Sequence, residues 1–363
     1  MLDFTSSLYL GLVHASRTLE PWEQLTLGAP AVVEEPASVA RTERDLAELV
    51  GCDRALLSRS TLHVFWDVFS GLEGRRVSLF WDDGAYPIAK WGIETMAARG
   101  VPARGFHHHS PESLARRILS LDPGRLPVVV CDGWCPGCGE LAPLEAYLDL
   151  VRAHGGLLIV DDTQAVGVLG RRHRGLPLGV GGGGSLRWEG LQGPDLLWCG
   201  SLAKALGVPM AAVAGDARVV ARIEARGETR VHCSPPSVAD LHAAQRALAI
   251  NHREGDALRR ALAQRVAHFR ERLRLAGLSA LGGPFPVQRV LLPSGVDSRR
   301  VHERLRHKGV RTVLQRSRCG PEVSVSFILT TRHGAPELTQ AVDLLTEALH
   351  DEHHERTRHE RVA

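Results

Sequence analysis

Short apolar runs alternate with longer amphipathic segments over residues 36–235. Turn-forming residues bound the apolar runs, which lie at 76–80, 127–132, 156–162, 195–200 and 211–215. The segments between them, such as 86–100, 110–121 and 143–155, have the spacing of amphipathic helices. Strands and helices in alternation predict βαβ units and a mostly parallel sheet with helices on both faces. We therefore expect an α/β, doubly wound large domain.

The pattern changes on both sides of this region. Residues 1–35 form an N-terminal arm, and 236–276 predict a long connecting helix that is broken near Gly255. A smaller α+β domain follows at 277–350, with strands near 286–292 and 323–329 and helices near 298–308 and 336–349. The polar residues 351–363 lack an apolar period and predict a frayed tail. The glycine run 181–184 predicts a mobile loop.

Composition narrows the class of protein. The 44 Lys and Arg residues nearly balance 41 Asp and Glu residues, so neither nucleic acid nor an anionic membrane is an expected partner. No apolar stretch is long enough for a membrane span, and the first residues lack the features of a signal peptide. The seven scattered cysteines are an odd number, which favours a reducing cytoplasm over a disulfide framework.

Polar residues follow the apolar runs, at the points where ligands bind an open parallel sheet. Lys204 is the most unusual of them, because it stands in a turn of small residues between two apolar runs. A lysine there can cap a helix or extend to water. The other residues in question are Trp81, Asp82, Asp83, Tyr86, Cys131, Asp132, Trp134, Asp161, Asp162, Thr163, Gln164 and Ser201.

A lysine, carboxylates and aromatic rings in one cleft meet the needs of pyridoxal phosphate chemistry. The lysine amine forms the Schiff base, and an acid partners the pyridinium nitrogen. An aromatic ring stacks on the cofactor, while hydroxyl groups and backbone N–H groups at a helix start hold the phosphate. The residues therefore predict an enzyme that uses this cofactor.

The stretches "IVDDTQAVGVLG" at 159–170 and "WCGSLAKALG" at 198–207 resemble the fold-type I pyridoxal-phosphate enzymes of the class I/II aminotransferase superfamily. The resemblance is greatest to the α-oxoamine synthase branch, which includes 8-amino-7-oxononanoate synthase and glycine C-acetyltransferase. Weaker matches at 6–12, 128–155, 232–237 and 309–333 extend it along most of the chain. It implies a homodimer with the active site at the subunit interface.

The resemblance also implies roles for individual residues. Lys204 matches the Schiff-base lysine, and Asp161 matches the pyridinium partner, with a surface carboxylate as the alternative. Ser201 matches a hydroxyl of the phosphate or lysine turn, with an ordinary N-cap as the alternative. Arg316, or failing it Arg318, matches the arginine that binds the substrate carboxylate, with a solvated surface as the alternative. The remaining assignments are the phosphate turn at Ser60, Thr61 and Leu62, a contact near the neighbouring subunit's phosphate at Ser234, and substrate binding at Asp132.

Three departures from the family pattern leave the reaction open. Tyr86 stands where the family stacks a histidine, and Gln164 stands where it places a second histidine near the cofactor's phenolic oxygen. Thr61 replaces the glycine of the usual phosphate turn. We expect an acyl-transferring synthase that takes an amino acid and an acyl-CoA or acyl-carrier-protein thioester. An aminotransferase or lyase, or a binding protein that kept the fold without the activity, is the alternative.

Cys131, Cys135 and Cys138 have the C-x3-C-x2-C spacing of radical iron–sulfur enzymes. They lie mid-chain in a doubly wound pattern, where such a cluster is out of place. The histidines 107–109 fit the end of a surface strand. The sequence therefore predicts no metal.

Overall fold

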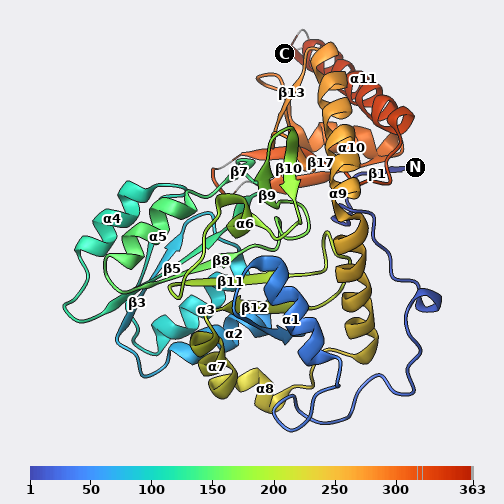
Figure 1. The fold of residues 1–363 in the computed structure, drawn as a ribbon. Helices are drawn as coiled ribbons and strands as arrows, with labels where there is room; N and C mark the ends of the chain where they lie inside the picture. Colours follow the sequence, from blue (N-terminus) through green and yellow to red (C-terminus); the bar gives the residue numbers. More distant parts are fainter. Residues whose placement is uncertain (317, 321, 361–363) are drawn as a thin grey trace. The chain divides into compact units, whose positions relative to one another are not determined.

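The computed structural model describes the backbone of residues 1–316, 318–320 and 322–360, and the side chains as far as Glu352 (Figure 1). The chain forms two compact units. Unit 1 comprises Met1–Gly11, Pro136–Glu140 and the chain from Ala257 onward. Unit 2 comprises Leu12–Cys135 and Leu141–Asp256.

Unit 2 is built on a seven-stranded sheet of order β2-β12-β11-β8-β5-β3-β4. Only β12 runs antiparallel to its neighbours, so the other strands end at the same edge of the sheet. The strands are β2 (Arg54–Ser58), β3 (Val77–Asp82), β4 (Ala103–Phe106), β5 (Leu126–Asp132), β8 (Leu157–Asp161), β11 (Leu196–Ser201) and β12 (Ala211–Gly215). This is the predicted doubly wound architecture, and each of the apolar runs in the sequence forms a strand.

Helices cover both faces of this sheet (Figure 1). Residues of α2, α3 and α7 pack with every second strand residue in one apolar core, while α4 and α5 lie across the sheet from them. The helices of unit 2 are α1 (Val39–Val50), α2 (Thr61–Leu72), α3 (Pro87–Ala98), α4 (Pro111–Leu119), α5 (Leu144–Arg152), α6 (Ser185–Glu189), α7 (Ala217–Arg226) and α8 (Glu228–His232). The short elements η1 (Ser16–Thr18), β6 (Trp134–Cys135), β7 (Glu140–Leu141), β9 (Arg171–His173) and β10 (Leu176–Val180) complete the chain up to α9.

Local sequence signals place the helix starts. Ser110 precedes α4 and accepts the Ser113 N–H at 3.1 Å, with proline at the first helical position. Asp216 caps α7 in the same way by accepting the N–H groups of Arg218 and Val219. These caps satisfy N–H groups that have no partner within their helices.

Unit 1 contains a four-stranded antiparallel sheet of order β13-β14-β17-β16, formed by β13 (Ser279–Leu281), β14 (Val287–Leu291), β16 (Val313–Arg316) and β17 (Val323–Ile328). Near the N-terminus, β1 (Leu2–Asp3) pairs with β15 (Val310–Arg311). Helices α10 (Ser298–His307) and α11 (Ala335–Glu360) pack with the sheet around one apolar core. The strands and helices predicted for this region are present.

Three of the predictions from the sequence are wrong. Helix α9 (Val238–Leu275) is unbroken at Gly255, because a single glycine costs a helix only about 1 kcal/mol and packing offsets that cost. Helix α11 continues to Glu360, where we predicted a frayed tail from residue 351. The glycine run 181–184 is not a loose loop: the Gly181 N–H donates to Asp256 at 2.8 Å, and the Gly184 N–H donates to Leu169 at 2.7 Å.

Among the described residues, no helix combines the length and the apolar character that a membrane span requires.

Candidate active site

Buried carboxylates line the carboxyl edge of the unit 2 sheet. Asp82, Asp132 and Asp161 are the last residues of β3, β5 and β8, and all three are buried. Asp132 lies directly opposite Asp161 in the register of β5 and β8. A buried carboxylate is costly unless hydrogen bonds or charges compensate it. These buried carboxylates make the carboxyl edge of the sheet the candidate location of an active site.

The two adjacent acids Asp161 and Asp162 have different environments. Asp162 is fully buried and accepts hydrogen bonds from Ser185 N–H, Ser185 Oγ at 2.5 Å and Trp198 Nε1 at 3.0 Å. Burial raises its pKa to about 7, against the effect of these donors. Asp161 points to the other face of the strand and accepts the Thr163 N–H at 3.0 Å. The Asp162 carboxylate is therefore bonded to buried donors within the protein, which makes Asp161 the candidate of the two for a ligand.

Lys204 lies in the turn that follows β11, next to the strand that ends in Asp161. The Ser201 N–H donates to Thr163 Oγ1 at 2.9 Å, and this hydrogen bond ties the lysine turn to the segment after β8. Lys204 is half-buried, while the residues on either side of the turn are packed in the core. The fold therefore brings Lys204 and Asp161 to the ends of neighbouring parallel strands.

Gly167 shows how closely these two segments approach each other. A Cβ atom at Gly167 would lie 2.7 Å from the Cβ of Ala205, and the φ of Gly167 is +81°. Both the space and the backbone conformation therefore favour glycine at this position. The glycine lets the segment after Asp161 pack against the lysine turn.

The start of α2 supplies N–H groups at the same edge. Ser60 has an extended backbone, and the first helical hydrogen bond runs from Val64 to Ser60, which leaves the N–H groups of Thr61 and Leu62 outside the helix ladder. In the described structure no side chain caps this start, and Ser60 Oγ instead lies 2.8 Å from His63 Nδ1. An uncapped helix start is suited to an anion.

The register of the strands relates this helix start to the lysine turn. Ser58 pairs with Ala211 on β12, and Ala211 pairs with Ser201 on β11. Two strand spacings, about 10 Å, therefore separate the end of β2 from Ser201. Ser60, Thr61, Leu62 and Ser201 thus lie on one side of the Asp161 strand.

Tyr86 is placed on the other side by a carboxylate. It precedes α3, and its N–H donates to Asp132 Oδ1 at 2.9 Å. Its side chain is 45% exposed, so the ring is accessible. Asp132, which we predicted as a substrate contact, therefore also fixes the start of α3 and the position of the Tyr86 backbone.

The remaining predicted residues are less closely tied to this edge. Gln164 is half-buried in the turn after Asp161, and Ser234 is half-buried in the loop between α8 and α9. Arg316 ends β16 in unit 1 and is exposed, whereas Arg318 is half-buried in the loop that follows it. Their assignments remain predictions.

Asp82, one of the polar residues that follow the apolar runs, is the centre of a hydrogen-bond network. Its carboxylate accepts hydrogen bonds from His108 Nδ1 at 2.5 Å, His109 N–H, Gly84 N–H and the Tyr147 hydroxyl. The sequence shows an acid at a strand end and three consecutive histidines. Asp82 and His108 are 26 positions apart, however, so their contact could not be predicted from the sequence.

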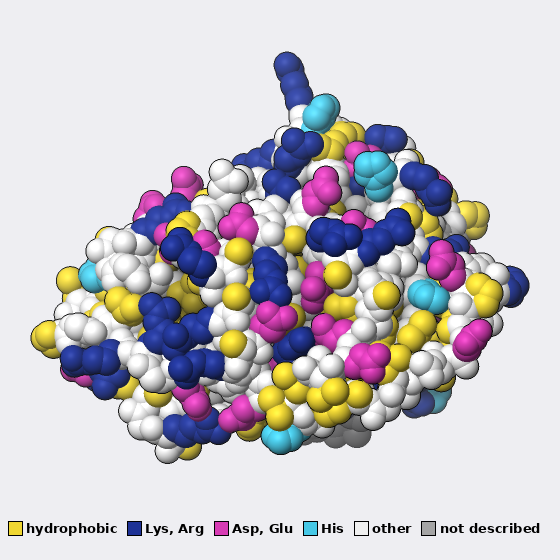
Figure 2. Space-filling view, turned by 60° about the horizontal axis from the view of Figure 1, so that its bottom comes forward, with side chains coloured by type: hydrophobic (Ala, Val, Ile, Leu, Met, Phe, Trp, Pro, Cys, Tyr) yellow, Lys and Arg dark blue, Asp and Glu magenta, His cyan; other side chains and the backbone are white. Residues whose placement is uncertain are grey.

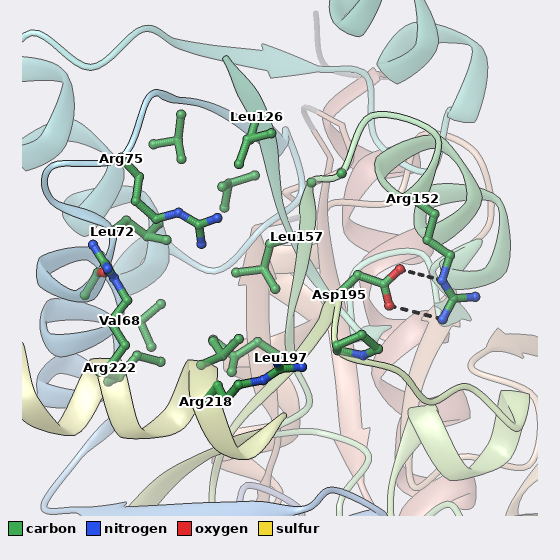
Figure 3. A pocket seen from close by; sticks show the side chains of 18 residues that line it. Val68, Leu72, Arg75, Leu126, Arg152, Leu157, Asp195, Leu197, Arg218 and Arg222 are labelled. Carbon is green, nitrogen blue, oxygen red and sulfur yellow. Dashed lines mark hydrogen bonds and ion pairs between the residues drawn. The ribbon is translucent and has the colours of Figure 1, made fainter. Parts of the chain in front are cut away.

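A cavity of about 430 Å³ lies at the opposite, amino edge of the same sheet (Figure 3). Apolar residues from the starts of β3, β5, β8 and β11 line it, together with α2 and α7, and arginines stand around it. Figure 2 likewise shows Lys and Arg side chains gathered among hydrophobic ones on one face of the molecule. Because ligands of open α/β sheets bind at the carboxyl ends of the strands, this cavity is not the candidate active site.

Known proteins have sequences similar to that of this chain. The family model for aminotransferase class I and II matches residues 92–316. The 8-amino-7-oxononanoate synthase of Chromohalobacter salexigens is 31% identical over 360 residues, which cover 96% of this chain and 88% of the relative. The corresponding synthase of Pseudomonas putida is 30% identical over 359 residues, with 96% and 87% covered.

Solved structures have the same fold. A serine palmitoyltransferase from Sphingomonas wittichii superposes with a TM-score of 0.81 at 17% identity, covering 95% of this chain and 86% of that one. An 8-amino-7-oxononanoate synthase from Francisella tularensis gives 0.73 at 19% identity, with 97% and 98% covered. The chain therefore belongs to the aminotransferase class I and II family, within the branch that contains the 8-amino-7-oxononanoate synthases.

Proposed function

We propose that this chain is a pyridoxal-phosphate-dependent α-oxoamine synthase that condenses an amino acid with an acyl thioester. The observation that carries the proposal is the pairing of Lys204 and Asp161 at the ends of adjacent parallel strands, in a chain of this family. The relatives named as 8-amino-7-oxononanoate synthases support the acyl-transfer reaction over other chemistry of the same family.

The side chains at the carboxyl edge fit this cofactor. Asp161 is 5% exposed and offers a carboxylate to a pyridine nitrogen, and Lys204 offers an amine to an aldehyde. The uncapped start of α2 and the hydroxyl of Ser201 offer donors to a phosphate. Asp161, Lys204 and the start of α2 thus offer a carboxylate, an amine and an anion site. These suit the ring nitrogen, the aldehyde and the phosphate of pyridoxal phosphate.

When bound, pyridoxal phosphate supplies an aldehyde that reacts with amines and a ring that withdraws electrons from the α-carbon of an amino acid. Asp161 would hold a proton on the ring nitrogen, because a buried carboxylate is best compensated by a positive partner. Lys204 would hold the group through its amine and would move a proton at the substrate's α-carbon. Tyr86 would exclude water from the bound group.

The residues at positions 86 and 164 shape the proton chemistry. Neither side chain offers the imidazole of the family's histidines, so Tyr86 and Gln164 would orient groups by stacking and hydrogen bonding. Lys204 is therefore the proposed carrier of the α-proton. Asp132 positions the Tyr86 segment, and Arg316 or Arg318 would bind the substrate's carboxylate.

The test is a panel of small amino acids, each incubated with the holoenzyme with and without acyl-CoA. Release of the thiol is followed with a thiol reagent, and the condensation product by mass spectrometry. We expect thiol release only when both substrates are present, and none from Lys204→Ala. Full amino-group transfer to keto acids without any thioester would replace the synthase proposal with the aminotransferase alternative.

We further propose that the enzyme is a cytoplasmic homodimer in which Ser234 contacts the phosphate bound by the neighbouring subunit. Light scattering after gel filtration measures the mass of the particle directly. Mixed dimers sharpen the test: if Ser234 acts across the interface, a Ser234→Ala subunit and a Lys204→Ala subunit will complement each other. A monomeric, active enzyme would contradict this part of the proposal.

A further inference from the structure

The cavity at the amino edge of the unit 2 sheet has walls of apolar side chains. All the residues that line it belong to unit 2, and its volume is about 430 Å³. Leu157 and Leu197 line it from the strand starts, and Val68 and Leu72 line it from α2 (Figure 3). Sites for small organic ligands measure roughly 300–1,000 Å³. The cavity is therefore large enough to hold the apolar part of such a ligand.

The charged residues that line the cavity are nearly all positive. Four of them are arginines, and Asp195 is the only acid among the lining residues. Asp195 already pairs with Arg152, through hydrogen bonds of 2.5 Å and 3.2 Å. Figure 3 shows Arg75 and Arg222 across the cavity from this pair. The side of the cavity next to α2 and α7 is therefore positively charged.

Arg222 uses only part of its hydrogen-bonding capacity within the protein. Its Nε donates to the Gly71 carbonyl at 2.6 Å, and its Nη2 donates to the Glu73 carbonyl at 3.0 Å. These bonds cap the end of α2, where a cation is favourable. Because a guanidinium carries five N–H donors, Arg222 keeps donors for a ligand.

The arginines on this side of the cavity have like charges for neighbours. Burial lowers the pKa of Arg222, and the charges of Arg226 and Arg75 lower it further. Among the described residues, Glu73 pairs with Arg99, and no carboxylate pairs with Arg75 or Arg222. Positive charges that lie together without a counter-ion attract an anion.

We propose that this cavity binds a fatty-acid carboxylate, with its chain between the apolar walls and its carboxylate at Arg75 and Arg222. The chain leaves water for an apolar surface, which supplies the main driving force. The forked donors of arginine match the two oxygens of a carboxylate. The site lies at the edge of the sheet opposite Lys204 and Asp161, so it goes beyond the proposed function and does not depend on it.

The surroundings of the cavity favour a dissolved molecule over the surface of a membrane. A membrane-binding helix inserts its apolar face into the lipid. The apolar face of α7 is not available for this, because Val220 and Ile223 are buried in the core of unit 2. The net charge of the whole chain is also only +3. The chain of one bound ligand, in contrast, fits inside the cavity.

The first test is equilibrium dialysis of the purified full chain against radiolabelled dodecanoate, kept below the concentration at which it forms micelles. We expect about one dodecanoate to bind per chain. Dodecanol keeps the apolar chain without the charge, and acetate keeps the carboxylate without the chain. Each should bind at least about tenfold more weakly than dodecanoate. Equal binding of either compound, or no binding of dodecanoate, would overturn the proposal.

Substitutions then locate the bound dodecanoate. Arg75→Gln should weaken its binding at least about fivefold, because a charge-assisted hydrogen bond is lost. Leu126→Trp should weaken it at least about tenfold, because the larger side chain occupies the cavity. Leu126 lines the cavity and is half-buried, so the indole can be accommodated. Arg76→Gln is the matched control and should bind normally, since Arg76 is exposed beside Arg75 but does not line the cavity.

Two further measurements separate this site from the active site and from a membrane surface. Lys204→Ala should bind dodecanoate as wild type does, whether or not the chain proves to be a synthase. Dodecanoate that acyl-CoA displaces, and that still binds Arg75→Gln and Leu126→Trp normally, would lie at the active site and would overturn the proposal. Sedimentation of the protein with phosphatidylglycerol vesicles, without binding of dissolved dodecanoate, would also overturn it.

Discussion

The two edges of the unit 2 sheet differ in the residues that line them. The carboxyl edge carries buried Asp82, Asp132, Asp161 and Asp162, most of them held by backbone N–H groups or buried side-chain donors. The amino edge carries the cavity of Figure 3, with apolar walls and arginines around it. There Asp195 pairs with Arg152 through two hydrogen bonds, of 2.5 Å and 3.2 Å.

The cavity and the candidate active site therefore lie at opposite edges of the sheet. Parallel strands point their carboxyl ends, and the helix starts that follow, toward one edge. Those helix starts favour anions. At the amino edge, apolar strand starts and arginines from the neighbouring segments line the cavity.

The largest effect should come from Lys204→Ala at the carboxyl edge. We expect activity to fall by roughly a thousandfold or more, since in the proposed function the amine both binds the cofactor and moves a proton. The visible absorption that appears when wild type is loaded with pyridoxal phosphate should also disappear. Lys308→Ala, in unit 1, is the matched control, and it should keep both signals. Wild type that cannot be loaded with the cofactor would refute the assignment.

Substitution of one of the two adjacent acids should affect turnover, and substitution of the other should affect stability. Asp161→Asn should keep the fold but lower turnover by two or more powers of ten, each worth about 1.4 kcal/mol of barrier. Asp162→Asn should instead destabilise the protein by roughly 2 kcal/mol, because its amide NH₂ would face the donors of Ser185 and Trp198. Steady-state kinetics and urea unfolding measure the two effects. The reverse pattern would mean that Asp162 is the cofactor's partner.

Buried acids on this side of the molecule should make stability depend on pH. Glu43 of α1 accepts the Leu57 N–H at 3.0 Å, and burial raises its pKa to about 7. An acid with a raised pKa in the folded state favours folding most below its ordinary pKa of 4.5, and that contribution is lost as the pH rises through about 7. The free energy of unfolding measured with urea should therefore fall between pH 5 and pH 8. For this one carboxyl group the fall is roughly 1 kcal/mol per pH unit at most.

Glu43→Gln keeps an oxygen for the Leu57 N–H but cannot ionise. We expect a shallower loss of stability over the same pH range in this variant. An identical slope in wild type and Glu43→Gln would show that Glu43 does not titrate there.

The smallest effect should come from the amino edge. Arg75 lines the cavity and is exposed, and Arg75→Gln should change kcat/KM by no more than about twofold, as surface substitutions do. Leu157→Phe, which extends a cavity-lining side chain, should behave the same way in kinetics. A large loss of thioester-dependent activity in either variant would show that the amino edge takes part in the reaction.

Several features could be predicted from the sequence alone. Apolar runs with turns at both ends gave the central strands, because a strand covered on both faces is continuously apolar. Lys204 and Asp161 were found because each follows such a run, and strand ends need no knowledge of distant contacts to be located. The caps of α4 and α7 are equally local, since the capping side chain lies within three residues of its partner.

Other features depend on contacts that only the tertiary structure defines. Whether Asp161 or Asp162 serves a ligand depends on Ser185 and Trp198, which lie more than twenty residues away in sequence. Helix α9 continues past Gly255 because packing on both sides of the glycine outweighs its low propensity. The contact between His108 and Asp82 likewise arises from chain folding. The sequence determined which residue types end each strand, because that is local, whereas side-chain environments arise from residues remote along the chain.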